Sequence, residues 1–575
     1  PAMTMLLWAL LTWACRLGWS TWLVFVVALL AGRWAWSCWR DMRSLPPGPW
    51  GLPVAGYLYF MGLGPKHSQF LSMAAKYGPV FSARLGNQLM VVLSDYRLIR
   101  DAFRREELTS RPDTPLMQAL DGFGIVNSKG VLWKEQRKFL HEKLRHFGMT
   151  LMGNGRQKME NRIMLEVNDL LTNLHATKGE ATDISSLLSV SISNVICNLM
   201  MSVRFSNDDV RFKRFTALIA EGMKLFGELI TAEYIPTFQY LPGKSEAKNK
   251  MMKNRDDMFQ FYQEIIDEHR STFDPNNIRD LIDSYLFEIQ KAKEEGRDAQ
   301  LFDGKDHGKY CTLISCTHYK YPFFSDQQIK QIIGDLFSAA MDTVRNMLLW
   351  IFVFMLRNPE AMKNVQEELD HVIGRGRLPS IEDLQYLPVT ETTILESLRR
   401  SSIVPLATTH TPTKDVTLGG YRIPAGCQVI PLINSVHMDP TLWDKPEQFD
   451  PKRFIDASGK VHKPDYFMPF GVGRRMCLGE VMARMELFLF FSSILHSFNV
   501  TLPDGVAPPT LNGHPGAALI PDSFKIQLTP RPMDYVLPPP FCALLRNVGS
   551  RYCGDRTRPP CPAPSAQCPV PRPGV

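Results

Sequence analysis

The sequence lacks the features that mark small disulfide-stabilised, disordered or nucleic-acid-binding chains. It has 11 cysteines in 575 residues, irregularly spaced and with no repeated CxxC pair, so a disulfide framework is not expected. The 65 Lys+Arg and 58 Asp+Glu nearly balance (65 − 58 = +7) and are mixed along the chain, so no nucleic-acid partner is implied. With 45% hydrophobic and 21% charged residues, the chain is expected to fold around a core.

Charge is also nearly absent near the N-terminus. From Met5 to Gly32 only Arg16 is charged, and such a stretch can span a bilayer, which takes ~20 residues. Tryptophans crowd its edges and basic residues follow it at 33–43. By the positive-inside bias, this predicts a membrane signal-anchor over residues 1–44 with the rest of the chain cytosolic. A cleaved secretory peptide is the alternative, but no basic segment precedes the apolar run and no small-residue cleavage site is clear.

Three other segments stand apart from the main body. Residues 45–53 contain four prolines, which cannot continue a helix, and are predicted to form a stiff hinge. Residues 308–324 lack clear periodicity and are interpreted as an atypical insertion. Residues 532–575 are dominated by Pro, Cys and Arg and are predicted to be a disordered tail. The alternative for the last two segments is that they are not part of the mature protein.

Helical periodicity dominates residues 54–531, which are predicted to form one large catalytic domain. The expected fold class is mainly α with small β-sheets. The clearest predicted helices cover 326–356, 360–374 and 383–399, and the strand-like pieces cover 80–85, 90–93, 415–423 and 428–433.

The segment from Phe470 to Glu480 carries the strongest chemical signal. Two of its glycines stand two residues apart and permit a tight turn where side chains would clash. A third glycine, Gly479, would let a flat group approach the backbone closely.

Within this segment, Cys477 opens an apolar helical run from Val481 to Phe490. A sulfur at a helix N-terminus faces oriented N–H groups and the positive end of the helix dipole. Arg474 and Arg475 add positive charge, so we expect a thiolate rather than a thiol. The alternative for a single cysteine is a small buried hydrophobic side chain.

A second motif pairs Glu396 with Arg399. Their i, i+3 spacing places both on one helix face, although the pattern alone is common by chance. Arg453 downstream could bring a second guanidinium to Glu396, which would give a buried bidentate network.

A third motif is the Asp342–Thr343 pair inside the long apolar helix. Such polar groups are costly there unless satisfied or functional, and a Thr hydroxyl can bond the carbonyl four residues before it. The alternative is a satisfied core Thr beside a surface Asp.

A fourth motif places Trp133 and Arg137 four residues apart on one helix face. Both could donate hydrogen bonds to one carboxylate, although an ordinary amphipathic helix gives the same pattern.

Together and in this order, the four motifs resemble the cytochrome P450 superfamily of haem-thiolate monooxygenases, over about residues 45–530. The chain looks like a microsomal member of the clan that contains vertebrate family 2. Segments 401–410 and 433–440 are similar to the insect family 18 enzymes, which are ecdysteroid 26-hydroxylases.

The resemblance implies a cytochrome P450 fold with an N-terminal transmembrane helix and haem b as cofactor. Cys477 would be the axial ligand of the iron. Asp342 and Thr343 would be the catalytic pair that delivers protons. Glu396, Arg399 and Arg453 would form a structural triad. The other implied haem-contacting residues are Arg111, Trp133, Arg137, His410, Phe470, Arg475 and Gly479.

The resemblance further implies a steroid monooxygenase that hydroxylates the C-26 side chain of ecdysteroids and so inactivates the moulting hormone. It would draw NADPH electrons through NADPH–cytochrome P450 reductase, with cytochrome b5 as an optional partner. It would be a single-pass protein of the endoplasmic reticulum membrane. The alternatives are a broad xenobiotic or fatty-acid hydroxylase and, in another class, a haem carrier or sensor without turnover. Asp342 and Thr343 argue against the carrier, which needs no proton relay.

Two surfaces follow from the same resemblance. The substrate would meet the apolar segments 122–126, 338–340, 404–407 and 517–520, with Ala340 standing where the family usually has Gly. An acidic reductase would meet a basic face, for which solvated surface charge is the alternative. The residues of that face would be Lys134, Lys138, Lys143 and Arg474.

Overall fold

The structure is a computed structural model, which describes most of residues 19–534. The gaps within that range are 53–54, 62–65, 115–121, 151–152, 207–208, 236–239, 295–325, 515 and 517. The start of the predicted anchor (1–18), the predicted insertion (308–324) and residues 535–575 of the predicted tail lie outside the described residues.

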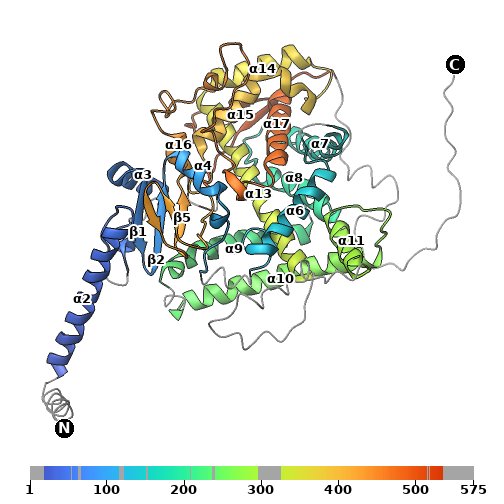
Figure 1. The fold of residues 1–575 in the computed structure, drawn as a ribbon. Helices are drawn as coiled ribbons and strands as arrows, with labels where there is room; N and C mark the ends of the chain where they lie inside the picture. Colours follow the sequence, from blue (N-terminus) through green and yellow to red (C-terminus); the bar gives the residue numbers. More distant parts are fainter. Residues whose placement is uncertain are drawn as a thin grey trace, which may run out of the picture.

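The body is mainly helical with small sheets, which confirms the predicted fold class (Figure 1). The helices are α2 (Trp19–Ser44), α3 (Lys66–Tyr77), α4 (Tyr96–Arg104), α6 (Gly130–His146), α7 (Asn154–His175), α8 (Ser185–Met201), α9 (Val210–Tyr234), α10 (Lys244–Ser271), α11 (Leu281–Glu294), α13 (Asp326–Arg357), α14 (Pro359–Ile373), α15 (Pro388–Ser401), α16 (Ile433–His437) and α17 (Glu480–Ser497).

Helix α13 runs through the centre of the body and carries the predicted 326–356 helix (Figure 1). It begins at Asp326 and ends at Arg357, and Pro359 then opens α14. Within the described part of the chain it is the one helix long and apolar enough to cross a membrane. However, 72% of its most apolar window is buried, so it serves as the core helix. It packs against α8 and α17 and thereby fixes the side chains that its middle turns present to the cavity described below.

The strands form three small sheets in the described residues. β1 (Val80–Leu85) pairs antiparallel with β2 (Gln88–Leu93), which pairs parallel with β5 (Gln428–Pro431). The remaining pairs are antiparallel, namely β3 (Val416–Leu418) with β4 (Tyr421–Ile423) and β6 (Phe498–Thr501) with β7 (Gln527–Pro530).

Two predicted elements prove to be divided. The strand expected at 415–423 is the β3–β4 hairpin, which turns at Gly419 (φ +57°) and Gly420 (φ +85°), a conformation that favours glycine. The helix expected at 383–399 is a 3₁₀ turn at Ile381–Tyr386 followed by α15, because Pro388 cannot continue a helix but suits the first turn of a new one.

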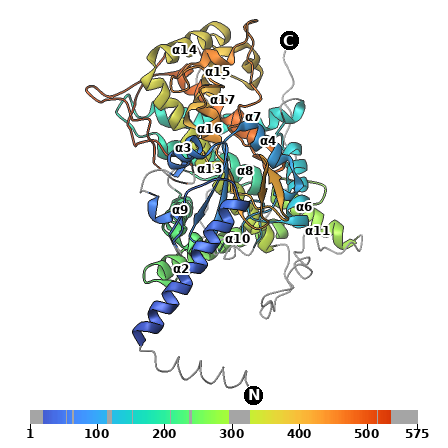
Figure 2. The ribbon, with the colours of Figure 1, turned by 60° about the vertical axis from the view of Figure 1, so that its left-hand side comes forward.

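Helix α2 projects away from the body beside the β1–β2 sheet (Figures 1 and 2). Its apolar side chains are exposed, with Leu23 at 66% and Leu30 at 61%. Its apolar part among the described residues, Trp22–Ser37, is shorter than a membrane span. The predicted hinge lies against β1, where Ser82 N donates to Pro47 O (2.9 Å) and Ser82 Oγ donates to Pro46 O (2.7 Å).

Candidate functional site

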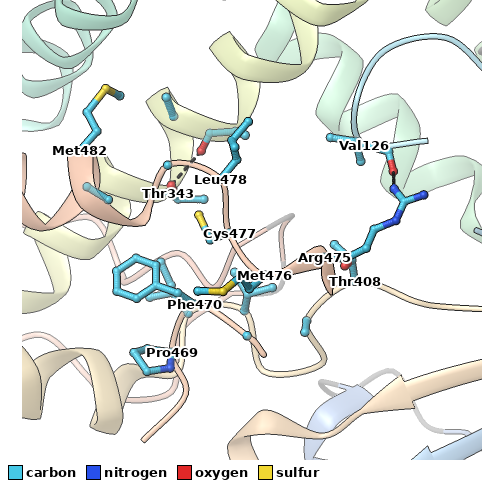
Figure 3. Close-up of a pocket in the computed structure, with 18 of the residues that line it drawn as sticks. Val126, Thr343, Thr408, Pro469, Phe470, Arg475, Met476, Cys477, Leu478 and Met482 are labelled. Carbon is cyan, nitrogen blue, oxygen red and sulfur yellow. Dashed lines mark hydrogen bonds between the residues drawn. The ribbon is translucent and has the colours of Figure 1, made fainter. Parts of the chain in front are cut away.

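A cavity of about 350 Å³ lies between the middle of α13 and the loop that precedes α17 (Figure 3). Its lining is mostly apolar. All eight residues that the sequence analysis assigned to haem contact or ligation border it, although they come from distant parts of the chain. They are Arg111, Trp133, Arg137, His410, Phe470, Arg475, Cys477 and Gly479.

The cysteine loop takes the tight turn that its glycines predict. Gly471 and Gly473 have φ of +74° and +79°, and a Cβ on Gly473 would lie 2.0 Å from the Phe103 carbonyl oxygen. Glycine is therefore required at position 473 by both conformation and space. Cys477 N donates to Phe470 O at 3.0 Å, which closes the loop and brings the cysteine to the cavity wall.

Cys477 points into the cavity, as Figure 3 shows, and its sulfur is accessible from there while protein surrounds it on the other sides. Helix α17 begins at Glu480, so the cysteine lies just ahead of the helix instead of opening it. Burial raises the pKa of Cys477, although the Gly479 N–H and the charge of Arg137 act in the opposite direction.

In the protein by itself, these effects do not favour the thiolate, and the thiolate at Cys477 stays a prediction. Desolvation in an apolar cavity outweighs the backbone N–H and the nearby cations. Arg474, expected to contribute positive charge, is exposed, does not border the cavity, and donates from Nε to Arg104 O (3.1 Å).

Three guanidinium groups gather at one side of the cavity and donate to backbone carbonyls. Arg111 donates to Val126 O (2.9 Å) and Thr409 O (2.8 Å). Arg475 donates to Thr109 O (2.7 Å) and Val126 O (3.1 Å), the latter bond drawn in Figure 3. The third, Arg137, donates to Met476 O (2.6 Å).

These cations repel one another and have no carboxylate partner among the described residues. Burial and then Arg111 and Arg137 lower the pKa of Arg475 to about 8. Burial and then Arg137 lower the pKa of Arg111 to about 10. His410 lies beside them, and burial and Arg111 lower its pKa to about 3, so its ring is neutral. Buried charges of one sign indicate a bound anion.

Two further observations show that the lining fits a flat anionic cofactor. The buried Trp133 Nε1 donor has no hydrogen-bond acceptor among the described residues, and Arg475 lies over the Trp133 ring at 4.2 Å. A Cβ on Gly479 would meet no protein atom within 4 Å, so the backbone there is open to a flat group. An apolar cavity with a sulfur on one wall and donors for carboxylates at one side can hold a metal-bearing macrocycle with acidic side chains.

Of the two residues of the predicted proton pair on α13, only Thr343 borders the cavity. Thr343 borders the cavity, and its Oγ1 donates to Ala339 O at 2.8 Å, the bond to the preceding turn that the sequence predicts (Figure 3). Asp342 does not border the cavity; its Oδ1 accepts from Arg345 Nη2 at 2.6 Å. Sequence reasoning missed Arg345, although its i, i+3 spacing from Asp342 is the signal that would have found it.

Glu396, Arg399 and Arg453 meet in one buried network. Arg399 Nε and Nη2 each lie 2.8 Å from a different oxygen of the Glu396 carboxylate, and Arg453 Nε donates to Glu396 Oε1 at 3.1 Å. Glu396 and Arg399 are both 0% exposed. The network lies behind the cavity, where it ties α15 to the segment around Arg453.

The sequence analysis did not identify Asp335, a further buried acid. Asp335 of α13 borders the cavity, and its Oδ2 accepts from the backbone N–H groups of Ile125 (2.8 Å) and Val126 (2.9 Å). Val126 O in turn accepts from Arg111 and Arg475, so one peptide segment joins α13 to two of the cations. A polar residue in an apolar helix, the criterion applied to Asp342, would have found Asp335.

Three of the four predicted substrate-facing segments border the cavity, through Ile125 and Val126, Ala339 and Ala340, and Val404 and Ala407. The fourth, 517–520, has no cavity-lining residue in its described part. There, Leu519 N supports the wall by donating to Ile403 O at 2.7 Å, while Ala517 lies outside the described residues.

Comparison with known proteins shows the family of the chain. The sequence profile described as cytochrome P450 matches residues 46–528. Cytochrome P450 18a1 of Drosophila melanogaster is 60% identical over 528 residues, covering 92% of this chain and 94% of that protein. Cytochrome P450 2U1 of Rattus norvegicus is 34% identical over 522 residues (87% and 93%), and cytochrome P450 2C3 of Oryctolagus cuniculus is 34% identical over 503 (86% and 96%).

These matches place the protein in a class of haem-containing monooxygenases. The chain belongs to the cytochrome P450 family. It is therefore an enzyme, and its family implies a haem cofactor and redox partners, in keeping with the lining of the cavity.

Proposed function

We propose that the enzyme hydroxylates the C-26 side chain of ecdysteroids and so inactivates the moulting hormone. The observation that carries this proposal is the 60% identity to cytochrome P450 18a1 of Drosophila melanogaster over nearly the whole length of both chains. The similarity of segments 401–410 and 433–440 to insect family 18 enzymes supports it. The mostly apolar cavity suits a bulky lipid, although such a lining does not single out a steroid.

The site residues divide into three proposed roles. Cys477 would ligate the haem iron, which when bound supplies the chemistry that inserts one oxygen atom of dioxygen into a C–H bond. Arg111, Arg137 and Arg475, with the indole N–H of Trp133, would hold the haem carboxylates; neutral His410 would pack beside them. Phe470 and Gly479 would face the macrocycle, and Glu396, Arg399 and Arg453 would keep the fold behind it.

We propose that Thr343 holds a proton at the cavity wall. Its hydroxyl donates to Ala339 O and still has lone pairs to accept a proton or a hydrogen bond from water. We propose that Asp342 resupplies that proton, which requires its carboxylate to leave Arg345.

Turnover of ecdysone and 20-hydroxyecdysone by the purified enzyme with NADPH and NADPH–cytochrome P450 reductase tests the substrate. Side-chain hydroxylation of either steroid, with little product from a fatty acid or a xenobiotic panel, is the expected result. Product from the lipids and none from the steroids would replace the ecdysteroid proposal with the broad hydroxylase. No turnover of any of them, despite a loaded haem, would favour a carrier or sensor.

We also propose that residues 1–44 anchor the enzyme in the endoplasmic reticulum membrane as a single pass, with residues 54–531 as the cytosolic catalytic domain. The exposed apolar side chains of α2 support this topology. Residues 45–53 would join the two, and 532–575 would be a disordered tail. Removing residues 1–44 should shift the protein from the membrane pellet to the supernatant; continued pelleting after a carbonate wash would contradict a single anchor.

The proposed redox partners are NADPH–cytochrome P450 reductase and, optionally, cytochrome b5. Lys134 and Lys143 of the expected basic face are paired with Glu106 and Glu288, whereas Lys138 and Arg474 are exposed. An acidic partner would therefore meet Lys138 and Arg474 first. Charge reversal at these two residues should raise the KM for reductase while leaving substrate binding unchanged.

A further inference from the structure

His437 lies in the 433–440 segment and has no role in the proposed chemistry. It ends α16, is fully buried and borders the cavity. Both ring nitrogens are hydrogen-bonded: Nε2 lies 3.1 Å from Met468 N, and Nδ1 lies 2.8 Å from Ser402 Oγ. A backbone N–H can only donate, so Nε2 must be the bare nitrogen, and Nδ1–H must donate to Ser402.

One arm of this arrangement leads to the cysteine loop. The Met468 N–H donates to His437 Nε2. The Met468 carbonyl accepts from the Gly471 N–H (3.0 Å). Phe470, one of the two residues between Met468 and Gly471, accepts the N–H of Cys477 (3.0 Å). A bond at the His437 ring therefore fixes the start of the loop that carries Cys477.

The other arm leads to a second segment of the cavity lining. Ser402 accepts from His437, and its own hydroxyl donates to Arg399 O at 2.9 Å. Its φ of +40° lies in the left-handed region, which is strained for a residue other than glycine. Ser402 begins a segment, 402–410, that supplies Ile403, Val404, Ala407, Thr408 and His410 to the cavity lining, and we call it the strap.

The backbone of His437 is also hydrogen-bonded, to Arg399. The His437 carbonyl accepts from Arg399 Nη1 at 2.6 Å, so the buried network of Glu396 and Arg399 fixes the backbone that carries the ring. Burial and then the charge of Arg399 lower the pKa of His437 to about 3, which keeps Nε2 available as an acceptor at neutral pH.

We propose that His437 is a positioning residue that sets the cysteine loop and the strap relative to each other, and thereby the two walls of the cavity. It acts through Met468 and Ser402 rather than on a reacting group. That the loop wall carries the haem ligand rests on the proposed function; the hydrogen bonds that define the role do not.

The test compares His437→Leu with a matched control in the full-length, haem-loaded protein. His496→Leu removes another fully buried ring that does not border the cavity and whose Nε2 bonds the Arg377 carbonyl. Loss of an acceptor worth about 1–3 kcal/mol should speed amide exchange in peptides containing Met468 by about 10- to 100-fold in His437→Leu only. The fraction of reduced carbon-monoxide complex with the thiolate-type spectrum should fall in that variant and not in the control.

Ser402 variants test the second arm separately and keep the proposal testable if His437→Leu does not fold. Ser402→Ala should leave the Met468 amide protected but weaken substrate binding, measured by the spectral shift on titration. Ser402→Gly, which adopts positive φ without strain, should restore most of that binding.

Unchanged Met468 exchange in His437→Leu, or equal Met468 exchange and spectra in His437→Leu and His496→Leu, would overturn the proposal. So would Ser402→Ala with unaltered substrate binding. The ligand assignment is separable: if Cys477→Ala kept the thiolate spectrum, the proposed role of Cys477 would fall, while the Met468 exchange result would still stand.

Discussion

The Glu396 carboxylate and the Arg399 guanidinium form two parallel hydrogen bonds of 2.8 Å in a position where neither side chain reaches solvent. Removing one partner of such a pair leaves the other charged and buried without compensation. We therefore expect Glu396→Gln to lower the free energy of unfolding by about 3–5 kcal/mol, measured by urea denaturation.

The exposed pair of Lys363 and Glu367, with side chains 73% and 62% exposed, provides the control. Glu367→Gln should change the free energy of unfolding by less than about 0.5 kcal/mol, because solvent screens that pair. Equal effects of the two substitutions would show that burial of Glu396 does not govern its contribution.

Thr343 offers a hydroxyl at the cavity wall, and its loss should impair proton delivery more than substrate binding. We expect Thr343→Ala to lower hydroxylated product per NADPH consumed by about tenfold or more, since positioned proton transfer contributes about 10²–10⁴-fold to rates. Thr343→Ser keeps the hydroxyl and should retain most of the coupling. Similar ratios for the Ala and Ser variants would remove Thr343 from the proton path.

In the part of the chain that the structure describes, the buried Trp133 donor has no acceptor, so its substitution should have opposite effects with and without haem. Trp133→Phe should speed haem transfer to a scavenging protein by about 10- to 100-fold, because a charge-assisted hydrogen bond is worth about 1.5–3 kcal/mol. The haem-free protein should be as stable or more stable, since an unsatisfied donor is gone. Trp443→Phe removes a donor that is bonded to Val436 O (3.0 Å) away from the cavity. It should lower the stability of the haem-free protein and leave the rate of haem transfer unchanged.

Glu486 of α17 is fully buried, and neither carboxylate oxygen has a hydrogen-bond partner in the described residues. Burial raises its pKa to about 8. Between the unfolded pKa of about 4.5 and about 8, the folded state binds more protons, so its stability falls as pH rises through that window.

Glu486→Gln removes this titration and should flatten the dependence of the unfolding free energy on pH between about 4.5 and 8. The unfolding free energy of the variant should exceed that of the wild type by the largest amount near pH 8. Glu360→Gln, at an exposed position on α14, should leave the slope unchanged. A wild-type slope retained in Glu486→Gln would show that the carboxyl is ionised in the folded protein.

The sequence alone determined what local patterns encode. The course of α13, the tight turn at Gly471 and Gly473, and the Thr343 bond to Ala339 depend on periodicity, glycine freedom and an i−4 contact, all of which act within a few residues. The motif at Cys477 likewise indicated the family without any long-range information.

Only the tertiary structure decided the relations between distant segments. Burial, which depends on everything packed around the cavity, raises the pKa of Cys477 against the local effect of its loop. The meeting of Arg111 with Arg475 at the Val126 carbonyl depends on how helices and loops pack. So does the position of His437 between Met468 and Ser402. Electrostatics and hydrogen bonding act through space, so no spacing along the chain could have fixed them.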